Sequence, residues 1–132
     1  MNIAPAGNRD GNSPARRRVL VLDDESVIAD TLAAILSLHG YECAATYSGD
    51  DAVERSRSFQ PDLLIADVVM PGTNGIQAAI QIRTMLPDCK ILLFSGQAAT
   101  ADLLEDARRS GHDFEILSKP VHPNDLLARI QS

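Results

Sequence analysis

Short apolar runs alternate along the chain with longer segments whose apolar residues recur every three or four positions. The short runs lack polar alternation and are rich in Val, Leu and Ile, which is typical of strands buried on both faces. We predict strands at Arg18–Leu22, Asp62–Asp67, Lys90–Ser95 and Phe114–Ser118, and a weaker one at Cys43–Tyr47.

The intervening segments show helical spacing and helix-terminating residues. Predicted helix signals are Ile28, Leu32, Ile35 and Leu36 before Gly40; Ser48 as an N-cap, with Asp50 and Asp51, up to Phe59; Ile76, Ala79 and Ile80 up to Pro87; Leu103, Leu104 and Ala107 before Gly111; and Leu126, Leu127 and Ile130 after Pro123. Ser is a good N-cap, Gly ends helices, and Pro suits the first helical position.

Five strand–helix units with short connections predict an α/β fold, a doubly wound five-stranded parallel sheet with helices on both faces. Ligand sites of such sheets lie where the strand order reverses, which favours the order 2-1-3-4-5. Residues 1–15 show no periodic apolar pattern and are expected to be a disordered tail, whereas residues 16–132 form one domain.

Charge narrows the range of partners. The 132 residues carry a net charge of −6; the first 18 carry +3, from four arginines and one aspartate, which leaves −9 on the remainder. Nucleic-acid binding rests on Lys and Arg, so we expect no nucleic-acid surface. The triplet Arg16–Arg18 is interpreted as a solvated flank, with contact to an acidic partner as the alternative.

The remaining composition points to a cytoplasmic protein. Cys43 and Cys89 have no metal-ligand spacing, so we expect small buried hydrophobes in a reducing compartment rather than a disulfide framework. The N-terminal segment lacks the apolar core of a signal peptide, and no apolar run is long enough to span a bilayer. We expect no membrane association.

Polar residues lie at or directly after the carboxyl ends of four of the predicted strands. Asp23 and Asp24 follow the first, Asp67 ends the third, Ser95 the fourth, and Lys119 comes directly after the fifth. Because the carboxyl ends of parallel strands share one edge, these side chains should converge. Three carboxylates would repel one another without a cation, and an oxygen-rich site with few protein ligands suits Mg²⁺. A hydroxyl and an ammonium group beside them suggest a phosphoryl group.

Competing chemistries lack their motifs. The chain has no Gly-rich phosphate loop followed by Lys, no Gly-x-Gly-x-x-Gly and no nucleophile elbow. A phosphatase of the haloacid dehalogenase type would need a second Asp two residues after the first, and that position is Val69.

Asp23-Asp24, Asp67 followed by Met70-Pro71 and Gly75, Ser95, and Lys119-Pro120 together resemble the receiver domain of two-component response regulators. The resemblance runs from about Arg17 to the C-terminus and implies a flavodoxin-like (βα)₅ fold. It implies that Asp67 is the phosphoacceptor, and that Asp24, Asp67 and the backbone carbonyl of Val69 bind Mg²⁺, with Asp23 acting mostly through water. Lys119 would contact the phosphoryl group, and Ser95 would move toward it.

The resemblance also implies the partners. A histidine kinase or histidine phosphotransfer protein would donate the phosphoryl group, and an unknown output protein would dock, with the chain a monomer or weak dimer. The chain departs from many receivers at Ile116, where they carry an aromatic residue. It stops at Ser132, after the fifth helix, which suggests a stand-alone receiver, with a receiver cut from a longer protein as the alternative. As a phosphoacceptor signalling protein, it is not expected to be an enzyme. The alternative hypothesis is an interaction module that docks partners independently of phosphorylation.

Overall fold

The computed structural model describes residues 17–70, 72, 74–96, 100–112, 114–118 and 122–131. Five strands alternate with five helices in this part of the chain, as the apolar pattern predicts. They are β1 (Arg18–Leu22), α1 (Ser26–Leu38), β2 (Glu42–Thr46), α2 (Gly49–Phe59), β3 (Leu63–Asp67), α3 (Gly75–Met85), β4 (Lys90–Ser95), α4 (Thr100–Arg109), β5 (Glu115–Ser118) and α5 (Pro123–Gln131).

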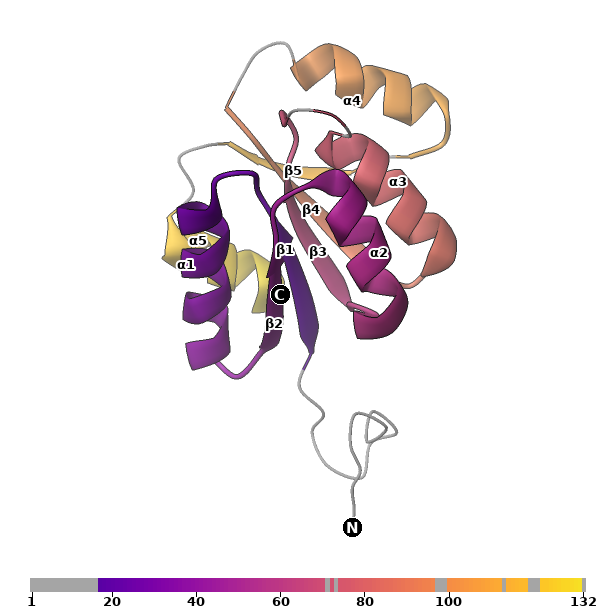
Figure 1. Ribbon diagram of the computed structural model, residues 1–132. Helices are drawn as coiled ribbons and strands as arrows, with labels where there is room; N and C mark the ends of the chain where they lie inside the picture. The colour runs from indigo at the N-terminus through magenta and orange to yellow at the C-terminus, as the bar shows by residue number, and fades with distance from the viewer. Residues whose placement is uncertain are drawn as a thin grey trace.

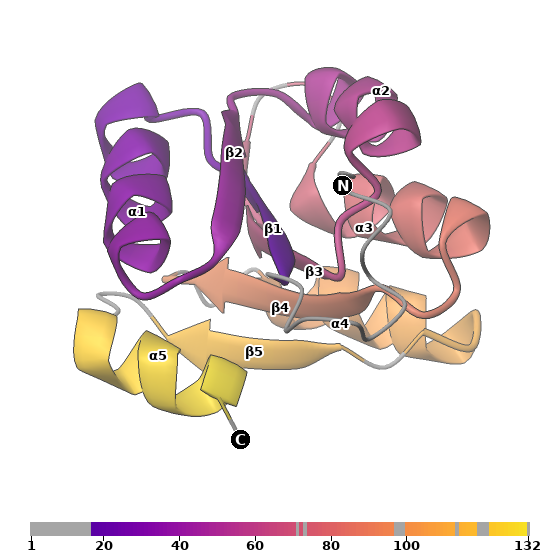
Figure 2. The same ribbon diagram turned by 90° about the horizontal axis from the view of Figure 1, so that it is seen from below.

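The five strands form one parallel sheet in the order β2-β1-β3-β4-β5, which confirms the predicted topology (Figure 1). Helices α1 and α5 cover one face of the sheet, and α2 and α3 cover the other (Figure 2). β1 and β3 lie at the centre, and the chain reverses its direction of winding between them. The fold is therefore a flavodoxin-like α/β fold.

Alternation along each strand divides the core into two layers. On the α1 and α5 side, Val19, Val21, Leu63 and Ile65 pack against Leu32, Leu36 and Leu126. On the other side, Leu20, Leu22 and Leu64 pack against Val53, Phe59, Ile76 and Ile82. Both faces of β1 and β3 are buried, which explains why these strands are continuous apolar runs rather than alternating ones.

Helix ends follow the predicted signals closely. The Ser48 side chain accepts a hydrogen bond from the backbone N–H of Asp51, and Pro123 is the first residue of α5. Gly40 and Gly111 adopt φ values of +95° and +93° after α1 and α4, where L-residues with a Cβ are strained. Asn74 and Gln77 form a reciprocal capping box at the start of α3.

The interpretation of the arginine triplet as a solvated flank is wrong for Arg18. Its side chain is 14% exposed, donates to the backbone carbonyl of Phe59 over 2.7 Å, and pairs with Glu42 at 3.4 Å. Its guanidinium also lies 5.6 Å from the centre of the Phe59 ring. Arg17 donates to the carbonyl of Ile130, and Arg16 lies outside the described residues. The two arginines hold helix C-termini on opposite faces of the sheet.

Within the described ranges, no helix combines the length and the apolar character that a membrane span requires.

Candidate functional site

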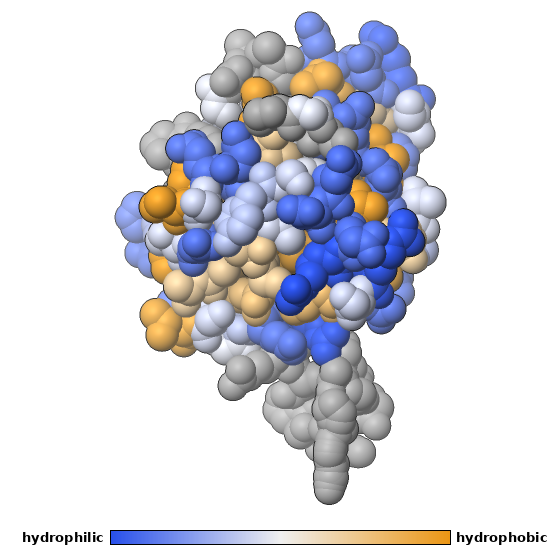
Figure 3. Space-filling view, viewed as in Figure 1, coloured by the Kyte–Doolittle hydropathy of each residue, from blue (hydrophilic) through white to orange (hydrophobic). Residues whose placement is uncertain are grey.

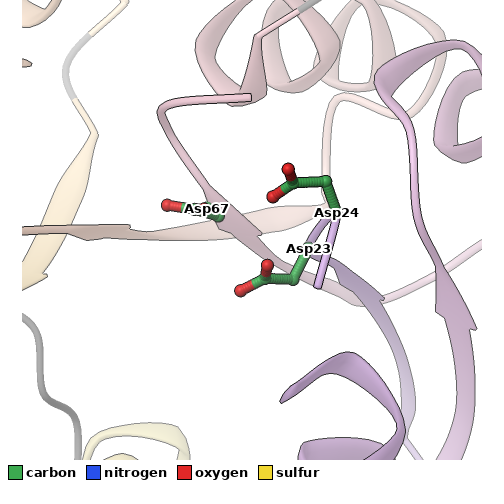
Figure 4. A group of neighbouring side chains, drawn as sticks. All are labelled: Asp23, Asp24 and Asp67. Carbon is green, nitrogen blue, oxygen red and sulfur yellow. The ribbon is translucent and has the colours of Figure 1, made fainter. Parts of the chain in front are cut away.

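Three aspartates meet at the carboxyl ends of the two central strands. Asp23 and Asp24 follow β1, Asp67 ends β3, and one carboxylate oxygen of each lies within 4.8 Å of the others (Figure 4). Asp23 is 1% exposed and Asp67 7%, whereas Asp24 is exposed to solvent. The convergence predicted from the strand ends is therefore present for these three acids, two of them buried and one exposed.

Backbone groups hold Asp23 in place. Its N–H donates to the carbonyl oxygen of Thr46 over 3.1 Å, which ties the residue to the end of β2. Its Oδ1 accepts the N–H of Glu25 over 2.9 Å, just before α1 begins. Thr46 is itself buried and donates from Oγ1 to the carbonyl oxygen of Val21. Thr46 therefore supports the site, a role that no local signal in the sequence indicates.

The start of α3 holds the backbone of Asp67. The N–H of Gly75 donates to the carbonyl oxygen of Val68 over 3.0 Å, which closes the loop after β3. A Cβ at position 75 would lie 2.0 Å from the Asp67 carbonyl oxygen and 2.8 Å from its carbon. Only glycine allows this approach, so Gly75 positions Asp67 through direct backbone packing.

Of the other predicted site residues, the structure describes Ser95 and Val69 but not Lys119. Ser95 ends β4, one residue beyond Phe94, which pairs in register with Asp67, so it lies at the same edge of the sheet. Val69 lies two residues after Asp67, with its side chain 40% exposed. Lys119 and Pro120 lie outside the described residues, and their predicted placement stays a prediction.

The donor set fits a hard divalent cation. Carboxylate oxygens are the ligands that Mg²⁺ prefers, and Mg²⁺ retains several waters, which an exposed Asp24 at the entrance permits. No His or Cys belongs to this group of described residues, so softer ions have no matching ligand there. The acidic triad is typical of the Mg²⁺ site of receivers.

The chain is similar to curated relatives over part of their length. The chain is 29% identical over 117 residues to the DNA-binding response regulator MtrA of Mycobacterium tuberculosis, covering 89% of this chain and 50% of that protein. It is 30% identical over 115 residues to the response regulator MprA of Mycobacterium ulcerans, with coverages of 87% and 49%. The chain thus spans about half the length of these curated relatives.

Solved structures match over nearly the whole of both chains. The chemotaxis protein CheY4 of Vibrio cholerae aligns with a TM-score of 0.78 and 25% identity, covering 89% of this chain and 98% of that one. A CheY-like receiver domain protein of Methanospirillum hungatei gives a TM-score of 0.78 and 25% identity, with coverages of 88% and 91%.

The family model described as the response regulator receiver domain matches residues 19–131. This range contains every residue of the acidic triad and all but the first residue of the sheet. With the order of the strands and the convergence of Asp23, Asp24 and Asp67 at one edge, the match shows that the chain belongs to the response regulator receiver family.

Proposed function

We propose that the chain is a phosphorylation switch in which Asp67 accepts a phosphoryl group and thereby changes the docking of a partner. The observation that carries this proposal is the position of Asp67: it is 7% exposed at the end of β3, and its carboxylate lies within 4.8 Å of two others. Three carboxylates this close repel one another, which is unfavourable for the fold. A role in binding or chemistry would explain why they lie together.

The transfer is a displacement at phosphorus. An oxygen of the Asp67 carboxylate attacks the phosphorus of a phosphohistidine, the P–N bond breaks, and the imidazole leaves with the electron pair and takes up a proton. The product is an acyl phosphate on Asp67. The chain's own contribution is to hold this carboxylate in place, through Gly75 and the loop after β3.

Asp24 and Asp67, with the backbone carbonyl of Val69, would hold Mg²⁺, and Asp23 would act through metal-bound water. When bound, Mg²⁺ neutralises negative charge on the phosphoryl oxygens, which is the main requirement of phosphoryl transfer. Lys119 would add a second positive charge. Ser95, at the same edge, would move toward the phosphoryl group and report its presence.

The donor would be a histidine kinase or a histidine phosphotransfer protein, because receiver domains interact with histidine kinases. The chain is a signalling phosphoacceptor module rather than a classical enzyme. MtrA is described as DNA-binding. Because the present chain carries a net charge of −6, which disfavours contact with nucleic acid, we propose that its own output is docking to a protein.

Incubation with acetyl phosphate and Mg²⁺, followed by intact-mass measurement, tests the proposal. The wild-type chain should gain the mass of one phosphoryl group, and Asp67→Asn should gain none. Asp125→Asn, an exposed aspartate on α5, is the matched control and should be phosphorylated normally. An undiminished increment in Asp67→Asn would overturn the assignment, and no increment in any variant would favour the phosphorylation-independent module.

A further inference from the structure

β2 is a short edge strand whose residues after Glu42 carry no charge, and it lies between α1 and α2. β2 is the end strand of the sheet and pairs with β1. Cys43, Ala44 and Ala45 are each partly exposed, and β2 carries its only charge at Glu42. In the space-filling view, pale and tan colours lie over the area between α1 and α2, whereas strong blue gathers over α2 (Figure 3). Edge strands are commonly protected by charge or proline, and residues 43–46 have neither.

The hydrogen bonds of β2 show which backbone groups face outward. The N–H of Glu42 donates to the carbonyl of Arg17, and the carbonyl of Thr46 accepts from Asp23, so both residues bond toward β1. Because bonding direction alternates along a strand, Ala44 also bonds toward β1. The N–H and C=O groups of Cys43 and Ala45 therefore point away from the sheet, toward its outer edge.

These two residues are spaced for antiparallel self-pairing. In an antiparallel ladder, opposed residues exchange two hydrogen bonds, and such pairs alternate with pairs that exchange none. If two copies pair about a twofold axis at Ala44, Cys43 lies opposite Ala45 of the second copy, and Ala45 lies opposite Cys43. The outward N–H and C=O groups of Cys43 and Ala45 in each copy then have hydrogen-bond partners in the other copy. The small Ala44 side chains meet at the axis.

The flanking residues agree with the same register. The segment Tyr41–Tyr47 reads Tyr-Glu-Cys-Ala-Ala-Thr-Tyr, with the chain's two tyrosines equidistant from Ala44. Pairing about Ala44 places Tyr41 opposite Tyr47 of the second copy, and Glu42 opposite its Thr46. Aromatic cross-strand pairs stabilise sheets, and this register sets no like charges opposite each other along the strand.

Both tyrosines lie on the face of the sheet that α1 covers. Tyr41 packs against the core layer beneath α1, and the Tyr47 hydroxyl donates to Asp30 of α1 over 2.6 Å. Tyr47 nevertheless stays 42% exposed. Tyr is enriched at the centres of protein interfaces, because its ring provides a large contact area with a polar tip.

We infer that β2 is a self-association surface, at which two copies of this chain form one continuous sheet through antiparallel pairing of Tyr41–Tyr47. The interface is isologous, so it closes as a dimer and does not propagate. The net charge of −6 on each copy opposes association. Added salt screens this repulsion, so the dimer forms more readily at high ionic strength.

Sedimentation equilibrium of the full chain tests the inference. The wild-type chain should dimerise with increasing concentration, and more strongly with added salt. Ala45→Pro removes an outward N–H without removing a bond to β1, so the monomer fold remains intact by circular dichroism. We expect this variant to lower the association constant by at least about tenfold, because the twofold axis removes two hydrogen bonds at once. Equal association of both proteins, or a wild type that stays monomeric, would overturn the inference.

Cysteine crosslinking tests the register of the two β2 strands directly and does not depend on the proline variant. The Cα atoms of a non-hydrogen-bonded pair lie about 4.5 Å apart, which is within reach of a disulfide. Ala44→Cys should therefore give a covalent dimer under mild oxidation. Thr31→Cys, on the solvent side of α1, is the control and should remain monomeric. Equal crosslinking of the two variants would show random collision and contradict the pairing.

Discussion

At the scale of single residues, two adjacent aspartates have different environments. Asp23 and Asp24 follow the same strand, but Asp23 is 1% exposed and Asp24 is open to solvent. One oxygen of Asp23 accepts the N–H of Glu25. A carboxylate committed to the backbone has less capacity to bind an ion directly, whereas Asp24 remains accessible to a hydrated cation. The structure therefore supports a division of roles between the two acids.

Mg²⁺ binding should reveal this division. We expect Asp24→Ala to weaken Mg²⁺ affinity by about 10- to 100-fold, and Asp23→Ala to weaken it less, because Asp23 would act through metal-bound water. Isothermal titration calorimetry measures both, with Asp125→Ala as the control for general loss of charge. The opposite order would show that the roles are exchanged.

A second prediction at this scale concerns the close approach of Gly75 to the Asp67 backbone. Ala at this position would place its Cβ 2.0 Å from the Asp67 carbonyl oxygen, so the loop after β3 must move. We expect Gly75→Ala to lower the free energy of unfolding by about 2–4 kcal/mol and to slow phosphorylation by acetyl phosphate. Urea unfolding and the rate of mass gain measure the two effects.

Gly40→Ala is the matched control for Gly75→Ala. Gly40 has a φ of +95° but open space around its Cβ position. This substitution should cost about 1–2 kcal/mol of backbone strain and leave the phosphorylation rate unchanged. If both variants are phosphorylated at the wild-type rate, Gly75 has no positioning role.

At the scale of elements, arginine side chains connect strands to the ends of helices. Arg18 is in β1, yet it binds the last residue of α2 and the first residue of β2. Its backbone N–H also donates to the Asp62 carboxylate over 2.8 Å, just before β3 begins. One half-buried arginine therefore joins three strands and a helix at the amino edge of the sheet, opposite the acidic site.

We expect Arg18→Ala to destabilise the fold by about 2–3 kcal/mol. The substitution leaves the Phe59 carbonyl and the Glu42 carboxylate without their partner, and it removes packing of the side-chain stem. Arg57→Ala on α2 is the control, because Arg57 is 60% exposed and pairs with Glu54 within its own helix. That variant should change the free energy of unfolding by less than about 0.5 kcal/mol in urea titrations. Similar losses would contradict the special role of Arg18.

The helices differ in how well their sequence pattern predicts their burial. Leu126, Leu127 and Ile130 of α5 are buried as predicted. On α4, Leu103, Leu104 and Ala107 mark the helix by their spacing, but of these Ala107 alone is buried and Leu103 is 36% exposed. α4 therefore rests on the sheet through less apolar contact than α5, among the side chains that the structure describes.

At the scale of the whole molecule, a buried thiol couples global stability to pH. Burial raises the pKa of the Cys89 thiol from 9.0 to about 11. Between these values the unfolded chain releases the proton while the folded chain retains it. This contribution to stability is therefore complete below pH 9.0 and is lost progressively as the pH rises toward about 11.

Urea unfolding at a series of pH values across this range should show a falling midpoint. Cys89→Ala removes the thiol, so its stability should decline less steeply with pH than that of the wild type. Tyrosines also titrate at high pH, and the comparison between the two proteins cancels their contribution. Parallel declines would show that the pKa of the Cys89 thiol does not differ between the folded and the unfolded chain.

Much of the fold follows from local pattern. The apolar runs place the strands to within one residue, and Ser48, Gly40, Gly111 and Pro123 mark helix ends correctly, because caps and turns depend on neighbours within a few positions. The polar residues after the strands also predict the acidic site, since parallel strands share a carboxyl edge. The sequence by itself thus determined the element order, the edge and the three acids.

Contacts between distant segments were decided only by tertiary structure. The burial of Arg18, the support that Thr46 gives Asp23, and the approach of Gly75 to the Asp67 carbonyl each join parts of the chain that no local pattern relates. They depend on strand register and helix placement, which arise when both faces of the sheet are packed. Local propensity selects the elements, but burial of the shared core decides which side chains meet.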